Sequence, residues 1–566
     1  MVKTLAQLIL LVSFIYGQKP IEVISSEEIQ NFGLKRFIDI FNYSGTSTTS
    51  TIDGNQFHLS SSNSDQTDIY VDGIKTDISI LDSENFDLLP LSVSEIQRIE
   101  FYEANSVGDK IITINPAINF VRKKVTELIS VNAKIDIFNE VNDPGPYRYT
   151  EKSSPNIDHH GPDAFVSISS KYDRFSGSVS HQFIEHRPLD ERLQKNYERK
   201  SVLGENWPDI LKNKTNLSLN YELKNHLFSI LSSHISYDDY YFFKSIESER
   251  PINHSSYSIQ LYGKSIFNRL KLLYSFTTKK TKSIEQNSSS LNTLLNLKST
   301  SKQIQIDGLY QFKNDRLMIQ YKSKNQELAL LSKHSDNFSI AYLSQLNKTV
   351  SINSGLNYDS FTRGNTVSID LLVNDYNFKT SYGKKSNLTH SEFIFIRQDT
   401  ISFQRRIANV FRTSFSKRIK FIHSFFKLNY ETSDLLESFY SFIYSGKFNF
   451  SDRTYTNFSL TWKSKAQNLF YIQLKIFAKI KTLYSIYPDF SLWMTARFYG
   501  KRSFEATNIK SQFLVDLGLN KSLWNSKIQL NLAVRNIFDS AWKSHPLGRD
   551  TDLTFEMGVS LLLSKN

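Results

Sequence analysis

Asp158, His159 and His160 stand side by side and are the best candidates in the sequence for metal binding. Imidazole nitrogens and carboxylate oxygens are common zinc ligands, but a structural zinc site takes four of them. The long polar connection that carries the pair, 140–162, supplies no further histidine or cysteine. A solvated loop tip is therefore the alternative. We predict no metal centre and keep His159 and His160 as ligand-binding candidates.

The same connection contains Tyr147, Arg148 and Tyr149, whose side chains suit an anionic ligand. A guanidinium group pairs with carboxylates and phosphates, and aromatic rings stack on it or on the ligand. Packing of the loop, or placement of the rings at a membrane boundary, is the alternative. The triplet is thus a second candidate for ligand binding.

The remaining sequence shows no set of residues typical of an enzyme. Serine is abundant, but no Gly-x-Ser-x-Gly motif, paired-carboxylate context or phosphate-binding glycine loop occurs. The chain has no cysteine, which excludes disulfides and thiolate chemistry. Its positive charge is spread along predicted strands without a recognition motif, which argues against nucleic-acid binding. We expect no enzymatic activity and no cofactor.

Alternating apolar and polar residues fill most of the chain and predict strands with one apolar face. Segments 164–172 and 215–223 are examples. Our segmentation gives about 22 strands, within the range of transmembrane β-barrels, whose tight turns alternate with longer loops. A soluble sandwich, propeller or β-helix is the alternative. The long connections are 140–162, 187–214, 283–298 and 384–407.

Composition favours the membrane barrel. Aromatic residues make up 13% of the 566-residue chain, with 42 Phe and 29 Tyr, although the mean hydropathy is −0.37. A lipid-facing surface with aromatic girdles around a polar lumen has this composition. Residues 1–17 resemble a signal peptide, with Lys3 before an apolar run; a buried N-terminal helix is the alternative. No later apolar run reaches the roughly 20 residues of a transmembrane helix.

Charge divides the chain in two. Residues 18–125 hold 16 acidic and 9 basic side chains, a net charge of −7, whereas the whole chain carries +12. An acidic small domain therefore precedes a basic large one, with the boundary near Arg122, Lys123 and Lys124. The basic region could attract an anionic substrate, face anionic lipopolysaccharide or complement the acidic domain.

The small domain contains two recognisable strands. In "LSVSEIQRIEFYEANSV", residues 91–107, we expect Ser94 to cap a short turn before a strand with Ile96, Ile99 and Phe101 in its core. "DIYVDGIKTD" predicts a second strand that ends in a turn at Asp72 and Gly73.

Both ends of the chain resemble TonB-dependent outer-membrane receptors. Residues 21–42 are similar to the opening strand and helix of that family's plug, with Ser26 as the helix cap. "IYVDG" resembles its "LIDG" turn, and "INFVRKK" resembles the "INIIT" strand that leads into the barrel. Near the C-terminus Val534, Asn536, Phe538 and Asp539 match the last hairpin. The expected apolar side of the helix is Ile29, Phe32, Phe37 and Ile40.

The resemblance implies an all-β membrane protein, a 22-stranded antiparallel transmembrane β-barrel with an N-terminal α+β plug domain inside the lumen. Its divisions would be a signal peptide (1–17), a plug (18–125) and a barrel (126–566), in the outer membrane of a Gram-negative bacterium. It implies uptake of a small-molecule nutrient, a ferric siderophore, haem or cobalamin, driven by a TonB-type inner-membrane partner. Ligand contacts would include the plug apex, at Ser47, Thr48 and Thr49.

Several positions depart from the family pattern. Glu103, Ala104 and Asn105 replace the usual Arg-Gly-Pro, and Ser60 and Ser61 replace Arg-Gly. Residues 18–20 alone precede the plug strand, which leaves little room for a TonB-contacting box. These departures favour a second hypothesis, a plugged barrel without active import that acts as a surface-binding or partner protein. A barrel enzyme is a third.

The predicted strands also imply which way some side chains point, in the plug and in the last strand. In the plug, Glu100 and Glu103 should point away from its core toward basic residues of the barrel. In the last strand the alternation predicts one set facing lipid and another facing the lumen. The lipid-facing set is Phe555, Met557, Val559 and Leu561, and the lumen-facing set is Glu556, Gly558 and Ser560.

Overall fold

We describe a computed structural model of the chain. The predicted signal segment 1–17 and Tyr147–Tyr149 lie outside the residues it describes. Those residues are 20, 22–35, 37, 40, 43–44, 47–49, 57–59, 68–75, 91–102, 106–107, 112–113, 117–142, 156–186, 210–243, 248–285, 297–312, 315–328, 331–345, 350–359, 363–373, 376–389, 404–419, 422–433, 439–451, 453–464, 476–504, 507–538 and 553–565.

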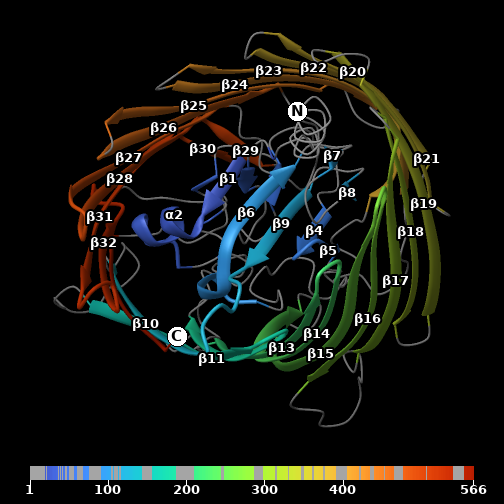
Figure 1. Cartoon of the computed structure of the whole chain (residues 1–566). Coiled ribbons are helices and arrows are strands. Elements are labelled where there is room, and N and C mark those ends of the chain that lie inside the picture. The colour runs from blue at the N-terminus through green and yellow to red at the C-terminus, as the bar shows by residue number, and fades with distance from the viewer. Residues whose placement is uncertain are drawn as a thin grey trace, which may run out of the picture.

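Twenty-two antiparallel strands form a closed barrel, as the sequence pattern predicted (Figure 1). Each strand pairs with its neighbour in the chain, apart from the step from β28 to β31, which skips the hairpin of β29 (Arg502–Phe504) and β30 (Thr507–Ile509). The barrel strands are β10 (Ile129–Asn142), β11 (Asn156–Tyr172), β12 (Phe175–His186), β13 (Ile210–Leu223), β14 (His226–Phe243), β15 (Ser248–Phe267), β16 (Leu270–Glu285), β17 (Leu297–Gln311), β18 (Asp315–Leu328), β19 (Leu331–Gln345), β20 (Val350–Asp359), β21 (Arg363–Val373), β22 (Tyr376–Thr389), β23 (Gln404–Ile419), β24 (Ile422–Ser433), β25 (Phe439–Ser451), β26 (Thr454–Lys463), β27 (Ile476–Tyr487), β28 (Phe490–Tyr499), β31 (Gln512–Leu523), β32 (Ile528–Arg535) and β33 (Thr554–Lys565).

The barrel is apolar outside and polar inside, the reverse of a soluble protein. On β27, Ile476 and Ile480 are 40% and 41% exposed, whereas Lys479 and Lys481 are only 1% and 3% exposed. Exposed isoleucines and buried lysines alternating along one strand fit a wall with lipid on its outer face and protein on its inner face. Among the described residues no helix is long and apolar enough to cross a membrane.

Tight turns join the strands at one end of the barrel. Asp173, Asn268 and Asn525 occupy three of these turns with φ of 49°, 36° and 54°. Asp and Asn tolerate the left-handed region better than other non-glycine residues, although Trp524 and Ser526, which flank Asn525, also have positive φ, of 52° and 65°.

The first and last strands close the barrel. β10 pairs with β33 in antiparallel register from Ile129 opposite Lys565 to Glu140 opposite Thr554. On β33, Phe555 and Met557 are 45% and 49% exposed, whereas Glu556 and Gly558 face inward. The predicted alternation is therefore confirmed for this part of the last strand.

A five-stranded sheet lies inside the ring of barrel strands (Figure 1), in the order β1–β6–β9–β4–β5. We call the described residues from β1 to β9 the plug. β4 pairs with β9 in parallel and the other neighbours are antiparallel. The stretch 123–128 leads from β9 directly into β10. The sheet strands are β1 (Glu22–Ser25), β4 (Asp68–Val71), β5 (Ile74–Lys75), β6 (Ile96–Tyr102) and β9 (Ala117–Arg122), and two small hairpins are formed by β2 (Ser47–Thr49) with β3 (Phe57–Leu59) and by β7 (Ser106–Val107) with β8 (Ile112–Thr113).

The plug helix α2 (Ser26–Asn31) is capped by Ser25, so the prediction of Ser26 was wrong by one residue. Ser25 is the last extended residue, and its hydroxyl accepts a hydrogen bond from the Glu28 amide at 3.1 Å while Glu28 accepts one from the Ser25 amide at 3.0 Å. The helix ends early because Gly33 turns the chain with φ of 56°. The four apolar residues expected on the helix are all buried, but only Ile29 lies within α2, since Phe32 is its C-cap and Phe37 and Ile40 follow it.

The short turn before β6 is also capped by an extended serine that directly precedes it. The 3₁₀ helix η2 (Val93–Glu95) is capped by Ser92 rather than by the predicted Ser94. Ser92 is extended, as a cap must be, whereas Ser94 already lies inside the turn and donates its amide to the Ser92 hydroxyl. Ile96, Ile99 and Phe101 are buried in the plug core, as predicted.

Truncation of Ile99 to Ala should weaken the plug by about 2–5 kcal/mol, because the side chain is fully buried. The barrel should still assemble, since its closure rests on strand hydrogen bonds that the plug does not supply. Influx of a small dye into cells that lack TonB should rise. Val23→Ala, on the 42% exposed Val23 of β1, is the control. Unchanged influx with loss of the assembled barrel would place this stretch in the wall.

Replacing Ile135, which is 52% exposed on the outer face of β10, with Lys should cost about 2–4 kcal/mol in a lipid bilayer. The same change at Asn132, on the lumen side of the strand, should cost much less. Urea unfolding of the two variants in lipid vesicles measures the difference. Equal costs would mean that the outer face of β10 does not contact lipid.

Candidate functional site between plug and barrel

Polar side chains of the barrel wall hold main-chain carbonyl groups of the plug. Lys479 of β27 donates to the Ser44 carbonyl at 2.6 Å, and Lys214 of β13 donates to the Leu91 carbonyl at 3.0 Å. Asn520 of β31 similarly binds the carbonyl of Asn31 at the end of α2. The last carbonyl groups of a helix have no hydrogen-bond partner within it, so the Asn520 side chain supplies one for Asn31.

An aromatic cluster packs the plug against β26 to β28. Phe32 of the plug contacts Tyr455 and Trp493 of the wall, with ring centroids 5.9 and 6.2 Å apart. Tyr43 lies beside Phe32, and the ammonium group of Lys481 is 3.1 Å from the centroid of its ring. Burial and the nearby Glu28 raise the pKa of Tyr43 well above its usual value, so its phenol stays neutral at physiological pH.

Glu28 is one plug carboxylate that meets a basic wall residue as the charge division predicted. Its Oε1 lies 3.3 Å from the Nζ atom of Lys447 on β25. Glu95 instead accepts hydrogen bonds from uncharged wall groups, the Ser180 hydroxyl at 2.8 Å and the Asn216 amide at 3.3 Å. Opposite charges therefore account for only part of the attraction between plug and wall.

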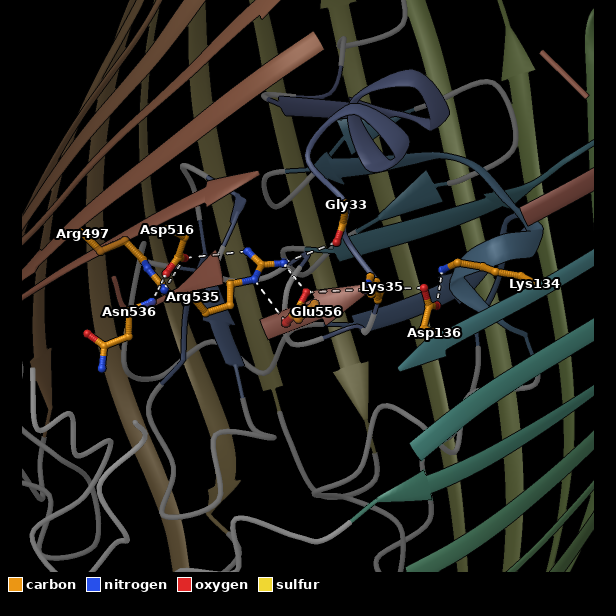
Figure 2. A network of polar contacts seen from close by, with 9 residues as sticks. All are labelled: Gly33, Lys35, Lys134, Asp136, Arg497, Asp516, Arg535, Asn536 and Glu556. Atoms are coloured by element: carbon orange, nitrogen blue, oxygen red, sulfur yellow. Dashed lines mark hydrogen bonds and ion pairs between the residues drawn. The ribbon is translucent and has the colours of Figure 1, made fainter. Parts of the chain in front are cut away.

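Seven charged side chains form a continuous row across the inner wall, which we call the charge belt (Figure 2). Its members alternate in sign, and only Lys35 comes from the plug. Asp516 is bound by Arg497 at 2.5 Å and lies 3.7 Å from Arg535, which forms two hydrogen bonds of 3.2 Å with Glu556. In order along the wall the belt is Arg497, Asp516, Arg535, Glu556, Lys35, Asp136 and Lys134.

Lys35 inverts the expected charge arrangement, because here a plug cation meets wall carboxylates. Its Nζ atom lies 3.5 Å from Asp136 Oδ1 and 3.7 Å from Glu556 Oε2, and its side chain is only 3% exposed. Charges buried this deeply lose their hydration, so their mutual attraction must compensate for the loss. Removing one member of the charge belt leaves its neighbours buried without that compensation.

Glu100 contradicts the predicted orientation toward the wall. Its carboxylate accepts hydrogen bonds from Arg98 at 2.6 Å, Tyr102 at 3.0 Å and Asn119 at 2.8 Å, all within the plug. Neighbouring donors on β6 and β9 satisfy the carboxylate, so it has no need of a wall cation. Glu103 lies outside the described residues.

The structure places some of the predicted ligand-binding residues on strands. His159 and His160 belong to β11, opposite Asn139 and Phe138 of β10, so the prediction that they lie in a loop was wrong. The alternation of the two strands continues past residue 140, and the connection begins only after Asn142. No cluster suited to a metal ion occurs among the described residues. Ser47, Thr48 and Thr49 form β2, and Tyr147, Arg148 and Tyr149 lie outside the described ranges.

No motif in the sequence indicated the charge belt. Apart from Lys134 and Asp136, two residues apart on β10, its members lie far from one another in the chain. The one usable signal is the alternation of apolar and polar positions along a strand. Lys134 and Asp136, like Glu556, fall on the polar side of a predicted alternating strand, where a charge must face the lumen.

Arg535→Ala should lower the free energy of unfolding by about 3–5 kcal/mol, because it leaves the carboxylates of Asp516 and Glu556 buried without their shared cation. Lys521→Ala is the matched control. It removes a barrel cation from an ion pair with Asp489 whose side chains are 35% and 49% exposed, and such a pair contributes at most about 1 kcal/mol. Urea unfolding measures both, and equal losses would contradict the importance given to the charge belt.

Known structures share the architecture of this chain. Neither a family model nor a curated protein sequence matches it. A ferric enterobactin receptor mutant of Pseudomonas aeruginosa is 10% identical with a TM-score of 0.75, over 96% of this chain and 98% of that one. The siderophore receptor PirA of Acinetobacter baumannii (11%, TM-score 0.72, 96% and 98%) and the FrpB iron transporter of Neisseria meningitidis (10%, TM-score 0.73, 96% and 99%) are also similar. The chain therefore has the plugged 22-stranded barrel fold of the TonB-dependent receptors.

Proposed function

We propose that the protein is an outer-membrane receptor and transporter that takes up a scarce nutrient by a TonB-dependent rearrangement of its plug. The observation that carries the proposal is the seating of the plug. A barrel of 22 strands is too wide to be filled by its own side chains, and here a separate sheet occupies the lumen. A blocked pore is useful to a cell when the block can be moved for a selected ligand.

The contacts between plug and wall are suited to such a movement. Many are hydrogen bonds and ion pairs, such as those of Lys214, Lys447 and Lys479, which water can replace when the plug shifts. A purely apolar interface would expose its whole area to water at a cost of roughly 25 cal/mol per Å².

For the substrate we favour a ferric siderophore over haem or cobalamin, because the similar structures are described as receptors for ferric enterobactin or siderophores, or as an iron transporter. The candidate contacts remain those expected from the sequence, at the plug apex and in the first long connection. They are Ser47, Thr48, Thr49, Tyr147, Arg148, Tyr149, His159 and His160.

The proposal includes the division of the chain and its place in the cell. Residues 1–17 act as a signal peptide that is removed, residues 18–125 form the plug, and residues 126–566 form the barrel. The mature protein resides in the outer membrane of a Gram-negative bacterium, surrounded by lipopolysaccharide on its outer side. A TonB-type transducer of the inner membrane supplies the energy.

A plugged barrel without active import is the second candidate. The charge belt favours it, because Lys35 is anchored among buried charges whose separation is costly. The replacement of the usual Arg-Gly-Pro by Glu103, Ala104 and Asn105 points the same way. Such a protein binds a ligand or partner at the surface without passing it inward.

Uptake of ⁵⁵Fe-labelled siderophores by cells with and without the protein, each in the presence and absence of TonB, separates the two candidates. We expect accumulation that needs both the protein and TonB. A tris-catecholate, a tris-hydroxamate and a citrate chelate form the panel, with haem and cobalamin as further arms. Surface binding without TonB-dependent accumulation would support the second candidate, and no binding of any member would contradict the proposed substrate class.

A further inference from the structure

The charge belt crosses the line where the barrel closes. Its wall members come from five strands that lie side by side, β28, β31, β32, β33 and β10. β33 is the last strand of the chain and β10 is the first of the barrel, so their pairing is the seam that turns a sheet into a closed ring. Every other neighbouring pair in the wall is also adjacent in chain order among the barrel strands. Only the seam pairs the first strand of the barrel with the last one.

The plug supplies the cation at the seam. Glu556 on β33 and Asp136 on β10 both face the lumen, and the register sets Asp136 opposite Gly558, two residues from Glu556. Each carboxylate has a cation on its own side of the seam, Arg535 for Glu556 and Lys134 for Asp136. Among the described residues, Lys35 is the one cation that pairs with both.

Gly558 provides the space for this arrangement. A Cβ atom on Gly558 would lie 2.3 Å from Asp136 Oδ1 and 3.5 Å from the Cε atom of Lys35, too close for the carboxylate to keep its position. The seam is therefore shaped to bring the Asp136 carboxylate across β33 toward the plug lysine. We call Lys35, Asp136 and Glu556 the seam triad.

We propose that the seam triad makes the local stability of the closed seam depend on the seated plug, although strand hydrogen bonds alone close the barrel. Strand hydrogen bonds hold β10 and β33 together, and Lys35 removes the repulsion between two carboxylates that the same pairing brings together. When the charge of Lys35 is lost while the plug stays seated, Glu556 and Asp136 keep only Arg535 and Lys134, and no cation links the two buried carboxylates across the seam. The seam is then the weakest line of the barrel wall.

Hydrogen exchange of the full-length protein in lipid nanodiscs, followed by mass spectrometry, tests this proposal. In Lys35→Met, which keeps the length of the side chain and removes its charge, amides of 129–140 and 554–565 should exchange at least about tenfold faster than in the unaltered protein. Amides of β17 and β18, far from the seam, should exchange as before. Lys447→Met, which breaks the ion pair with Glu28 on β25, should leave the seam unchanged.

A second substitution separates charge from packing. In Lys35→Met combined with Asp136→Asn, one of the two facing negative charges is gone, and the slow exchange of the seam should return. If the single variant does not assemble, the recovery of a heat-resistant folded band by the double variant is the equivalent result. Unchanged exchange in Lys35→Met, an equal increase over the whole wall, or no recovery in the double variant would each overturn the proposal.

Discussion

The hydrogen-bonded pairing of β10 with β33 is the constraint on which the rest of the structure depends. Within a membrane no water reaches the backbone, so each amide and carbonyl group of the wall needs a partner from a neighbouring strand. An open sheet leaves two edges unsatisfied, and only pairing of the first and last strands removes them. Closure gives every strand an outer and an inner face, and the alternation of apolar and polar residues sets lysines such as Lys479 and Lys481 on the inner one.

A closed ring of this width creates the next problem, an interior that side chains cannot fill. The plug solves it with a core in which Ile99, Phe101 and Phe120 are fully buried, and with wall contacts that are partly aromatic and partly hydrogen bonds and ion pairs. The two layers of interaction differ in character. The core holds the plug together as a unit, whereas the wall contacts hold that unit in place. Movement of the plug as a body, with its sheet intact, is consistent with this division.

Much of this arrangement could be read from the sequence, because its causes are local. The alternation of apolar and polar residues indicated the strands and their number, and Asp72 with Gly73 marked the turn between β4 and β5, with φ of 52° and 86°. The helix and turn caps were misplaced by one or two residues, since runs such as Ser25-Ser26 offer equivalent side chains and only the backbone decides between them. The charge belt could not be predicted, because it depends on which distant strands become neighbours. The predicted orientation of Glu100 was wrong for a related reason, because its partner Asn119 lies on another strand.

Wall lysines bind main-chain oxygens of the plug at Ser44 and Leu91, and this choice has an evolutionary consequence. Every residue type offers the same carbonyl group, so a mutation at either plug position can change the side chain without deleting the contact. The lysines thereby recognise the path of the plug backbone and do not depend on the side chains at these positions. An interface built in this way tolerates genetic drift in one partner while the other stays fixed, and plug and barrel need not evolve in step at these points.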